Sequence, residues 1–142
     1  MVGTPIRNPA GRWRVAARKL PEGGGAQDLP PLESARRELS EEAGLRADHW
    51  LPLAEDVHLS NSITDERAFA FLAWGLSPDH TFAKDSSEEL SVRRVSFAEA
   101  VKMALSGAIT DGFSLVMLLK ADHLLRTGAL PRELADLMLK GS

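Results

Sequence analysis

The sequence predicts one domain of the α/β (α+β) class over residues 1–142. Three observations support this class: apolar residues recur at helical spacing over 32–43, an aromatic-rich run with alternating phenylalanines occupies 68–76, and a capping pattern begins another helix at Ser96. A chain of this length has room for one hydrophobic core that folds unaided.

The N-terminal part contains few signals of regular structure. Residues 1–19 should form a short segment, irregular over 1–11 because of two glycines and two prolines. Residues 12–20 predict a short strand. Residues 21–31 predict a loop, because three adjacent glycines and three prolines exclude regular structure.

The helix over 32–43 is the most strongly predicted element. Pro31 suits its first turn and Gly44 suits a left-handed C-terminal cap. Its apolar positions share one face, which we expect to be buried: Leu32, Ala35, Leu39 and Ala43.

Further elements follow from the same patterns. The sequence predicts strands over 57–59, 68–76 and 90–95, and an acidic loop over 79–89. It predicts helices from Ser96 to Gly107, over 111–125, and over 132–139 within a C-terminal tail of residues 126–142.

Composition limits the function classes. The chain is 44% hydrophobic and 26% charged, with a net charge of -3 and no cysteine. The acidic balance argues against nucleic-acid binding and against an anionic membrane surface. The absence of cysteine excludes disulfides and thiolate sites, and the N-terminus lacks the apolar region of a secretory signal. We therefore expect a cytoplasmic enzyme that acts on a small molecule.

Three glutamates of the predicted helix carry the chemistry. Glu38, Glu41 and Glu42 stand at i, i+3 and i+4, so their carboxylates share one face. Mg²⁺ takes oxygen ligands, and a few carboxylates plus substrate phosphates form a sufficient site for it. A solvated surface with arginine partners is the alternative, and spacing alone leaves both interpretations open.

The residues around these acids resemble the Nudix hydrolase family. Residues 37–45 (RELSEEAGL) fit the second half of the Nudix box, and Gly23 stands at the position of its leading glycine. Residues 20–24 (LPEGG) and 31–35 (PLESA) look like the ADP-ribose pyrophosphatase branch of the family. The box would then occupy residues 20–45.

The resemblance implies a fold, a reaction and a set of ligands. The fold would be an α/β/α sandwich with a mixed sheet, and the reaction would be metal-dependent hydrolysis of a nucleoside diphosphate derivative such as ADP-ribose or another nucleotide sugar. Glu38 and Glu42 would be the principal Mg²⁺ ligands, with Mn²⁺ as a substitute. Glu41 would be a third ligand or would anchor the water, and the main-chain carbonyl of Glu22 would complete the shell.

The other candidate site residues have competing explanations. Glu88 is the candidate base, because the base of this branch comes from a loop downstream of the box, but a plain acidic loop also explains it. Glu66 is a candidate contact to metal or substrate, with a surface ion pair as the alternative. Gly23 and Gly24 would let the main chain approach a phosphate, although a turn explains them equally well.

Two departures from the family pattern put the function in question. Leu29 occupies the position where the box has a glutamate, so Arg37 would lose a partner that orients the helix unless the adjacent Asp28 substitutes for it. Only nineteen residues precede Leu20, fewer than is usual in this branch, so we expect a sheet shortened at the N-terminus. An uncovered sheet edge invites pairing, and we therefore predict a homodimer.

Two other functions remain open. One is a Nudix enzyme that acts on nucleoside triphosphates or dinucleoside polyphosphates. The other is a catalytically weak or inactive Nudix-fold module that binds a nucleotide or a protein.

Overall fold

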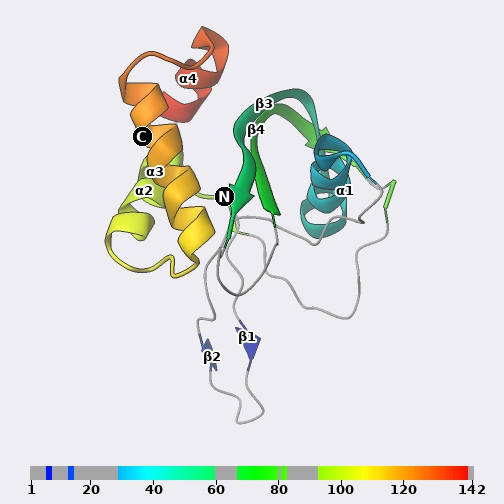
Figure 1. The fold of residues 1–142 in the computed structure, drawn as a ribbon, viewed down its shortest axis with the longest axis horizontal. Helices are drawn as coiled ribbons and strands as arrows, with labels where there is room; N and C mark the ends of the chain where they lie inside the picture. Colours follow the sequence, from blue (N-terminus) through cyan, green and yellow to red (C-terminus); the bar gives the residue numbers. More distant parts are fainter. Residues whose placement is uncertain are drawn as a thin grey trace. The chain divides into compact units, whose positions relative to one another are not determined.

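The computed structural model describes residues 6–7, 13–14, 29–59, 67–79, 81–82 and 93–140. Helices and antiparallel strand pairs make the chain α+β, which confirms the predicted class (Figure 1). The chain divides into two compact units, Glu22–Lys84 and a second unit of Met1–Pro21 with Asp85–Ser142. The expectation of a single domain over 1–142 stays a prediction. In the described part of the chain, no helix is long and apolar enough to cross a membrane.

The unit Glu22–Lys84 begins with helix α1, Pro31–Ala43, as the sequence predicts. Pro30 precedes it and provides no side-chain cap, while Gly44 ends it with φ of 64°. The Gly44 N–H donates to the carbonyl of Ser40 at 2.9 Å. A left-handed residue at this position favours glycine, so the predicted C-terminal cap is confirmed.

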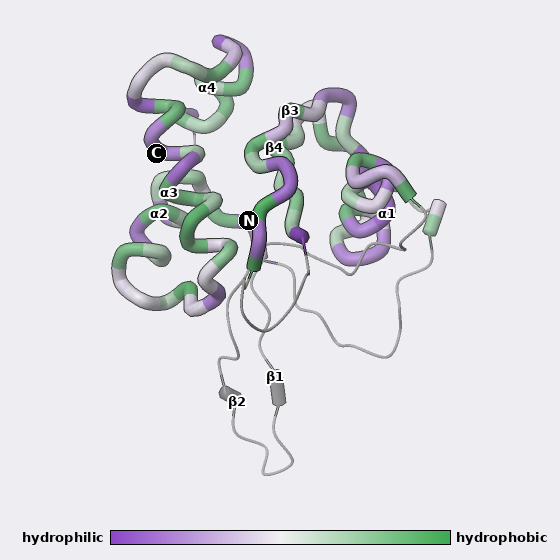
Figure 2. The backbone as a smooth tube through the Cα atoms, in the orientation of Figure 1, coloured by the Kyte–Doolittle hydropathy of each residue, from purple (hydrophilic) through white to green (hydrophobic). Residues whose placement is uncertain are grey.

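Helix α1 is mostly hydrophilic (Figure 2) and packs against the strands that follow it. The predicted apolar stripe is only half-buried. The one fully buried side chain of the helix is Ser40, with 2% exposed. The position of α1 therefore depends on polar contacts as well as on apolar packing.

Strands β3, Leu45–His58, and β4, Arg67–Pro78, form a long antiparallel hairpin. The prediction over 68–76 is confirmed, whereas the strand predicted over 57–59 begins twelve residues earlier. Charged residues and Pro52 interrupt the apolar alternation of β3, so its strand character comes from pairing with β4.

The hairpin is irregular at two places. Its register shifts between Pro52 and Ala54 and again before Val57, and Asp56 in this stretch has φ of 57°. The Asp56 carboxylate pairs with Arg67 at 2.6 Å across the strands. Such bulges bend a strand and increase its twist, which lets one long hairpin curve beside α1.

The described residues of the other unit form a short strand pair and three helices. Strand β1, Ile6–Arg7, pairs with β2, Trp13–Arg14, in antiparallel register. The strand predicted over 12–20 is thus confirmed at Trp13–Arg14, and its remaining positions lie outside the described residues. The expectation that 1–11 is irregular is wrong at Ile6–Arg7, because pairing with β2 supplies hydrogen bonds that local composition does not reveal.

The helices of this unit are α2, Phe97–Leu105, α3, Gly112–Arg126, and α4, Arg132–Leu139. All three match predicted helices. Ser96 Oγ accepts from the Glu99 N–H at 3.1 Å, and Asp111 Oδ2 accepts from the Ser114 N–H at 2.7 Å. These caps satisfy N–H groups that have no partner within the helix.

A compact apolar core holds α2 and α3 together. Its buried members are Ala100, Ala104, Ile109 and Leu118, with Val95, Phe97, Met103 and Leu115 packed around them. The strand predicted over 90–95 is wrong at residues 93–95, which form no strand, and Val95 packs on the helices instead. Residues 90–92 lie outside the described part.

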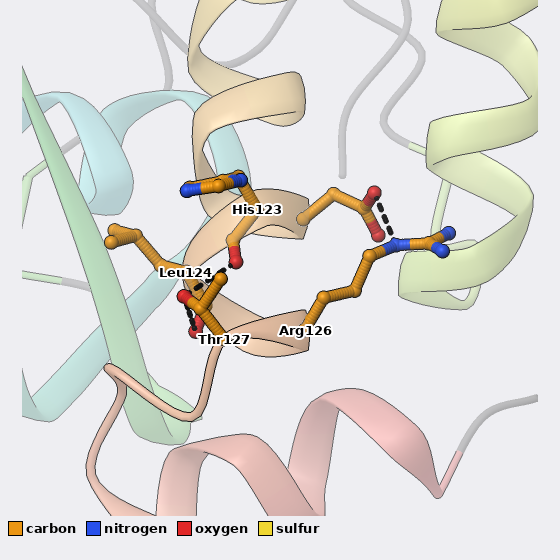
Figure 3. A network of polar contacts seen from close by, with 5 residues as sticks. His123, Leu124, Arg126 and Thr127 are labelled. Atoms are coloured by element: carbon orange, nitrogen blue, oxygen red, sulfur yellow. Dashed lines mark hydrogen bonds and ion pairs between the residues drawn. The ribbon is translucent and has the colours of Figure 1, made fainter.

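Polar side chains at the C-terminal end of α3 make contacts with the helix itself (Figure 3). Thr127 Oγ1 donates to the carbonyl of His123 at 2.9 Å, and Arg126 pairs with Asp122 at 2.8 Å. These contacts are local and exposed, so they finish a helix and do not form a site.

Candidate functional site

The three box glutamates lie on α1 and are all half-buried. Glu38, Glu41 and Glu42 occupy i, i+3 and i+4 of a regular helix that Gly44 closes. The sequence prediction that they share a helix is therefore confirmed. Their partial burial argues against the alternative that these glutamates form a fully solvated surface with arginine partners. The neighbouring Glu33–Arg36 pair does fit that alternative: it is exposed, with 2.6 Å between Oε1 and Nη1.

Arg37 has a partner within the helix. Its Nε donates to Glu41 Oε1 at 2.6 Å, and the exposed fraction of the Glu41 side chain is 24%. The hydrogen bond to Glu41 is the main reason that the pKa of Arg37 is raised. Leu29, at the position where the family has an acid, is 42% exposed. Arg37 therefore has a partner, Glu41, although the acid that the family places at position 29 is absent.

Phe82 also contacts Arg37. The guanidinium carbon of Arg37 lies over the Phe82 ring at 5.7 Å from its centroid. This distance is within the range of a cation–π interaction. The sequence gives no local signal for Phe82, because it is a single phenylalanine in a polar stretch.

Asp79 joins the end of β4 to the end of α1. Its N–H donates to the carbonyl of Gly44 at 2.9 Å, while its Oδ1 accepts from the N–H of Thr81 at 2.9 Å. The Thr81 hydroxyl also donates to this carboxylate and, together with the Thr81 N–H, lowers the pKa of Asp79. Ser40 lowers this pKa further, as a smaller contribution.

The donor chemistry of the helix fits a hard divalent cation. Three carboxylates supply only oxygen, which suits Mg²⁺ and Mn²⁺. Within the described ranges, no three histidine, aspartate or glutamate side chains lie together as a group that could hold a metal ion, and this includes Glu38, Glu41 and Glu42. The helix acids would thus need ligands from elsewhere. The other candidate residues, Glu22, Gly23, Gly24, Glu66 and Glu88, lie outside the described residues.

The tryptophans of the hairpin make intramolecular contacts. Trp50 Nε1 donates to the carbonyl of Ala47 at 3.1 Å and the Trp50 ring meets Phe71 edge-on. Trp74 stacks on His49 with centroids 5.1 Å apart. Both tryptophans are half-buried, and these contacts lie within the hairpin.

Comparisons with known proteins agree with the geometry of the helix. The NUDIX domain model matches residues 4–112. A protein named ADP-ribose pyrophosphatase from Mycobacterium tuberculosis (strain ATCC 25618 / H37Rv) is 34% identical over 107 residues, which cover 74% of this chain and 51% of that protein. The chain thus spans about half the length of this curated relative.

A solved structure described as "Crystal structure of ADP compounds hydrolase" has the same fold. It superimposes with a TM-score of 0.72 and 17% sequence identity, covering 89% of this chain and 66% of that one. The matched family region contains the whole of α1 and its glutamates. The chain belongs to the NUDIX domain family.

Proposed function

We propose that the chain is a Nudix hydrolase that cleaves the pyrophosphate bond of a nucleoside diphosphate derivative, with ADP-ribose or another nucleotide sugar as substrate. The observation that carries this proposal is the row of half-buried glutamates on α1, inside the region matched by the NUDIX model. The name of the 34% identical relative supports the substrate class.

The proposal includes a divalent cation, Mg²⁺ or Mn²⁺. Glu38 and Glu42 would be its principal ligands, Glu41 a third ligand or the anchor of the water, and the carbonyl of Glu22 a further ligand. Such an ion neutralises the diphosphate, orients it and lowers the pKa of the attacking water.

The residues of the chain would position the reactants and accept the proton. Glu88 would take the proton as water attacks one phosphorus and the bridging P–O bond breaks. ADP-ribose would then give AMP and ribose 5-phosphate. Gly23 and Gly24 would bring main-chain N–H groups near the diphosphate, and Glu66 would contact the metal or the substrate.

Turnover of ADP-ribose tests the proposal. We expect phosphatase-coupled phosphate release that requires Mg²⁺ and that Glu42→Gln lowers by at least about 100-fold. Glu33→Gln is the matched control, because Glu33 lies on the same helix and its partner among the described residues is the exposed Arg36. Equal activity in wild type and Glu42→Gln would reject the assignment of α1 as the active site.

A binding module is the second candidate function. The Arg37–Glu41 ion pair favours it, because this pair already occupies an oxygen of one candidate ligand, Glu41 Oε1. Calorimetry would distinguish the two functions: a module would bind ADP-ribose without consuming it. Turnover confined to nucleoside triphosphates or dinucleoside polyphosphates would instead indicate another Nudix substrate.

The proposal also includes a homodimer in the cytoplasm. Among the described strands, β3 and β4 pair only with each other, so each has an edge that no other described strand covers. Such edges favour association. Light scattering at micromolar concentration should give the mass of a dimer, and a monomer would contradict this part.

A further inference from the structure

The residues that follow β4 contact α1 at two separate points. Asp79 binds the carbonyl of Gly44 through its N–H at the C-terminal end of the helix. Phe82 contacts the guanidinium of Arg37, which precedes Gly44 by seven residues. At a rise of about 1.5 Å per residue, these points are roughly 10 Å apart along the axis.

Arg37 makes two contacts that use different parts of its guanidinium. Nε donates to Glu41 Oε1, while the guanidinium carbon lies over the Phe82 ring. A planar guanidinium can form both kinds of contact at once, and together they restrict its rotation. Arg37 therefore links an aromatic ring from beyond β4 to a candidate metal ligand.

We propose that Phe82 is a positioning residue, which holds Arg37 so that Nε fixes Glu41 in one rotamer. This inference rests on the proposed function. The ion pair uses Oε1, and we assign Oε2 to the cation or its bound water. Phe82 thus restrains the arginine in a chain that carries Leu29 where the family has an acid.

Phe82 is 41% exposed, so it is no core residue whose loss would unfold the chain. Phe69 on β4 provides a matched control. It is 39% exposed, but it stacks on no cation in the described part of the chain. If Phe82 served packing alone, Phe82→Leu and Phe69→Leu should have the same effect on Mn²⁺ affinity.

The first readout is Mn²⁺ binding to the substrate-free protein, measured by electron paramagnetic resonance. We expect Phe82→Leu to weaken binding about 2- to 5-fold, the range given by an exposed cation–π contact. Phe82→Trp should restore wild-type affinity, since an indole binds cations better than a phenyl ring. Phe69→Leu should leave affinity unchanged.

A double-mutant cycle then tests whether Phe82 acts through Glu41. In a Glu41→Gln background, Phe82→Leu should have almost no further effect on Mn²⁺ affinity. Full additivity of the two substitutions, or failure of Phe82→Trp to rescue, would overturn the inference.

These measurements separate the inference from the proposed function. If Glu42→Gln leaves Mn²⁺ affinity unchanged, α1 is not the metal site, and both the proposed function and the role of Phe82 are rejected. If Glu42→Gln abolishes binding while Phe82→Leu equals Phe69→Leu, only the positioning role fails.

Discussion

Helix α1 and helices α2 and α3 are stabilised in different ways. Helices α2 and α3 begin with side-chain caps at Ser96 and Asp111, and they bury a shared apolar core. Helix α1 has no side-chain cap, and its one fully buried side chain is a serine. Its order comes from Gly44, from the hairpin and from residues after β4. The difference indicates that α1 gives up core packing in order to present charged side chains.

The largest stability effect is expected in the core of α2 and α3. Ile109 is 2% exposed, so Ile109→Ala should lower the free energy of unfolding by about 2–5 kcal/mol through lost burial and a cavity. Urea denaturation measures this effect. Leu105→Ala is the control, since Leu105 is 73% exposed and should change stability by no more than about 0.5 kcal/mol. Similar losses in both variants would reject the core described for this unit.

A smaller effect is expected at the start of α3. Asp111→Ala removes the acceptor for the Ser114 N–H and should cost about 0.5–2 kcal/mol. Asp111→Asn should keep most of the stability, because asparagine caps helices equally well. Thermal unfolding of the two variants provides the test. If Asp111→Asn is destabilised as much as Asp111→Ala, the charge of Asp111 matters more than its capping hydrogen bond.

The smallest effect is expected at Asp79 and depends on pH. Its pKa is lowered below 3.8 in the folded chain, mainly by the Thr81 hydroxyl and then by the Thr81 N–H. Its contribution to stability is therefore present above that value and is lost as pH falls through the folded pKa. Asp79→Asn should be less stable than wild type at pH 7, and the difference should shrink below about pH 4.

Thr81→Val isolates the cause of this pH dependence. Without the hydroxyl, the acid-dependent loss of stability should become smaller than in wild type, as measured by urea midpoints between pH 3 and 7. A midpoint difference between wild type and Asp79→Asn that stays constant with pH would contradict the assigned role of the carboxylate.

The sequence predicted the helices well, because their signals are local. Pro31 and Gly44 mark the ends of α1, and Ser96 marks the start of α2. Strand β3 was predicted only at its end, because its residues become a strand through pairing with β4 and not through their own pattern. Long-range pairing also explains why Ile6–Arg7 was missed.

The candidate site was predictable to a similar extent. The spacing of Glu38, Glu41 and Glu42 placed the acids on one helix, and the box motif indicated the family. The contacts of Asp79 and Phe82 with α1 were not predictable, because they join residues far apart in sequence and neither belongs to a motif. The partner of Arg37 was also unexpected, since Glu41 had been assigned to the metal.

The most direct test of the account compares turnover of ADP-ribose by wild type, Glu42→Gln and Glu33→Gln with and without Mg²⁺. We expect Mg²⁺-dependent hydrolysis that falls by at least about 100-fold in Glu42→Gln and persists in Glu33→Gln. Turnover that is equal in all three proteins, or that does not need a divalent cation, would contradict the claim that α1 carries the active site.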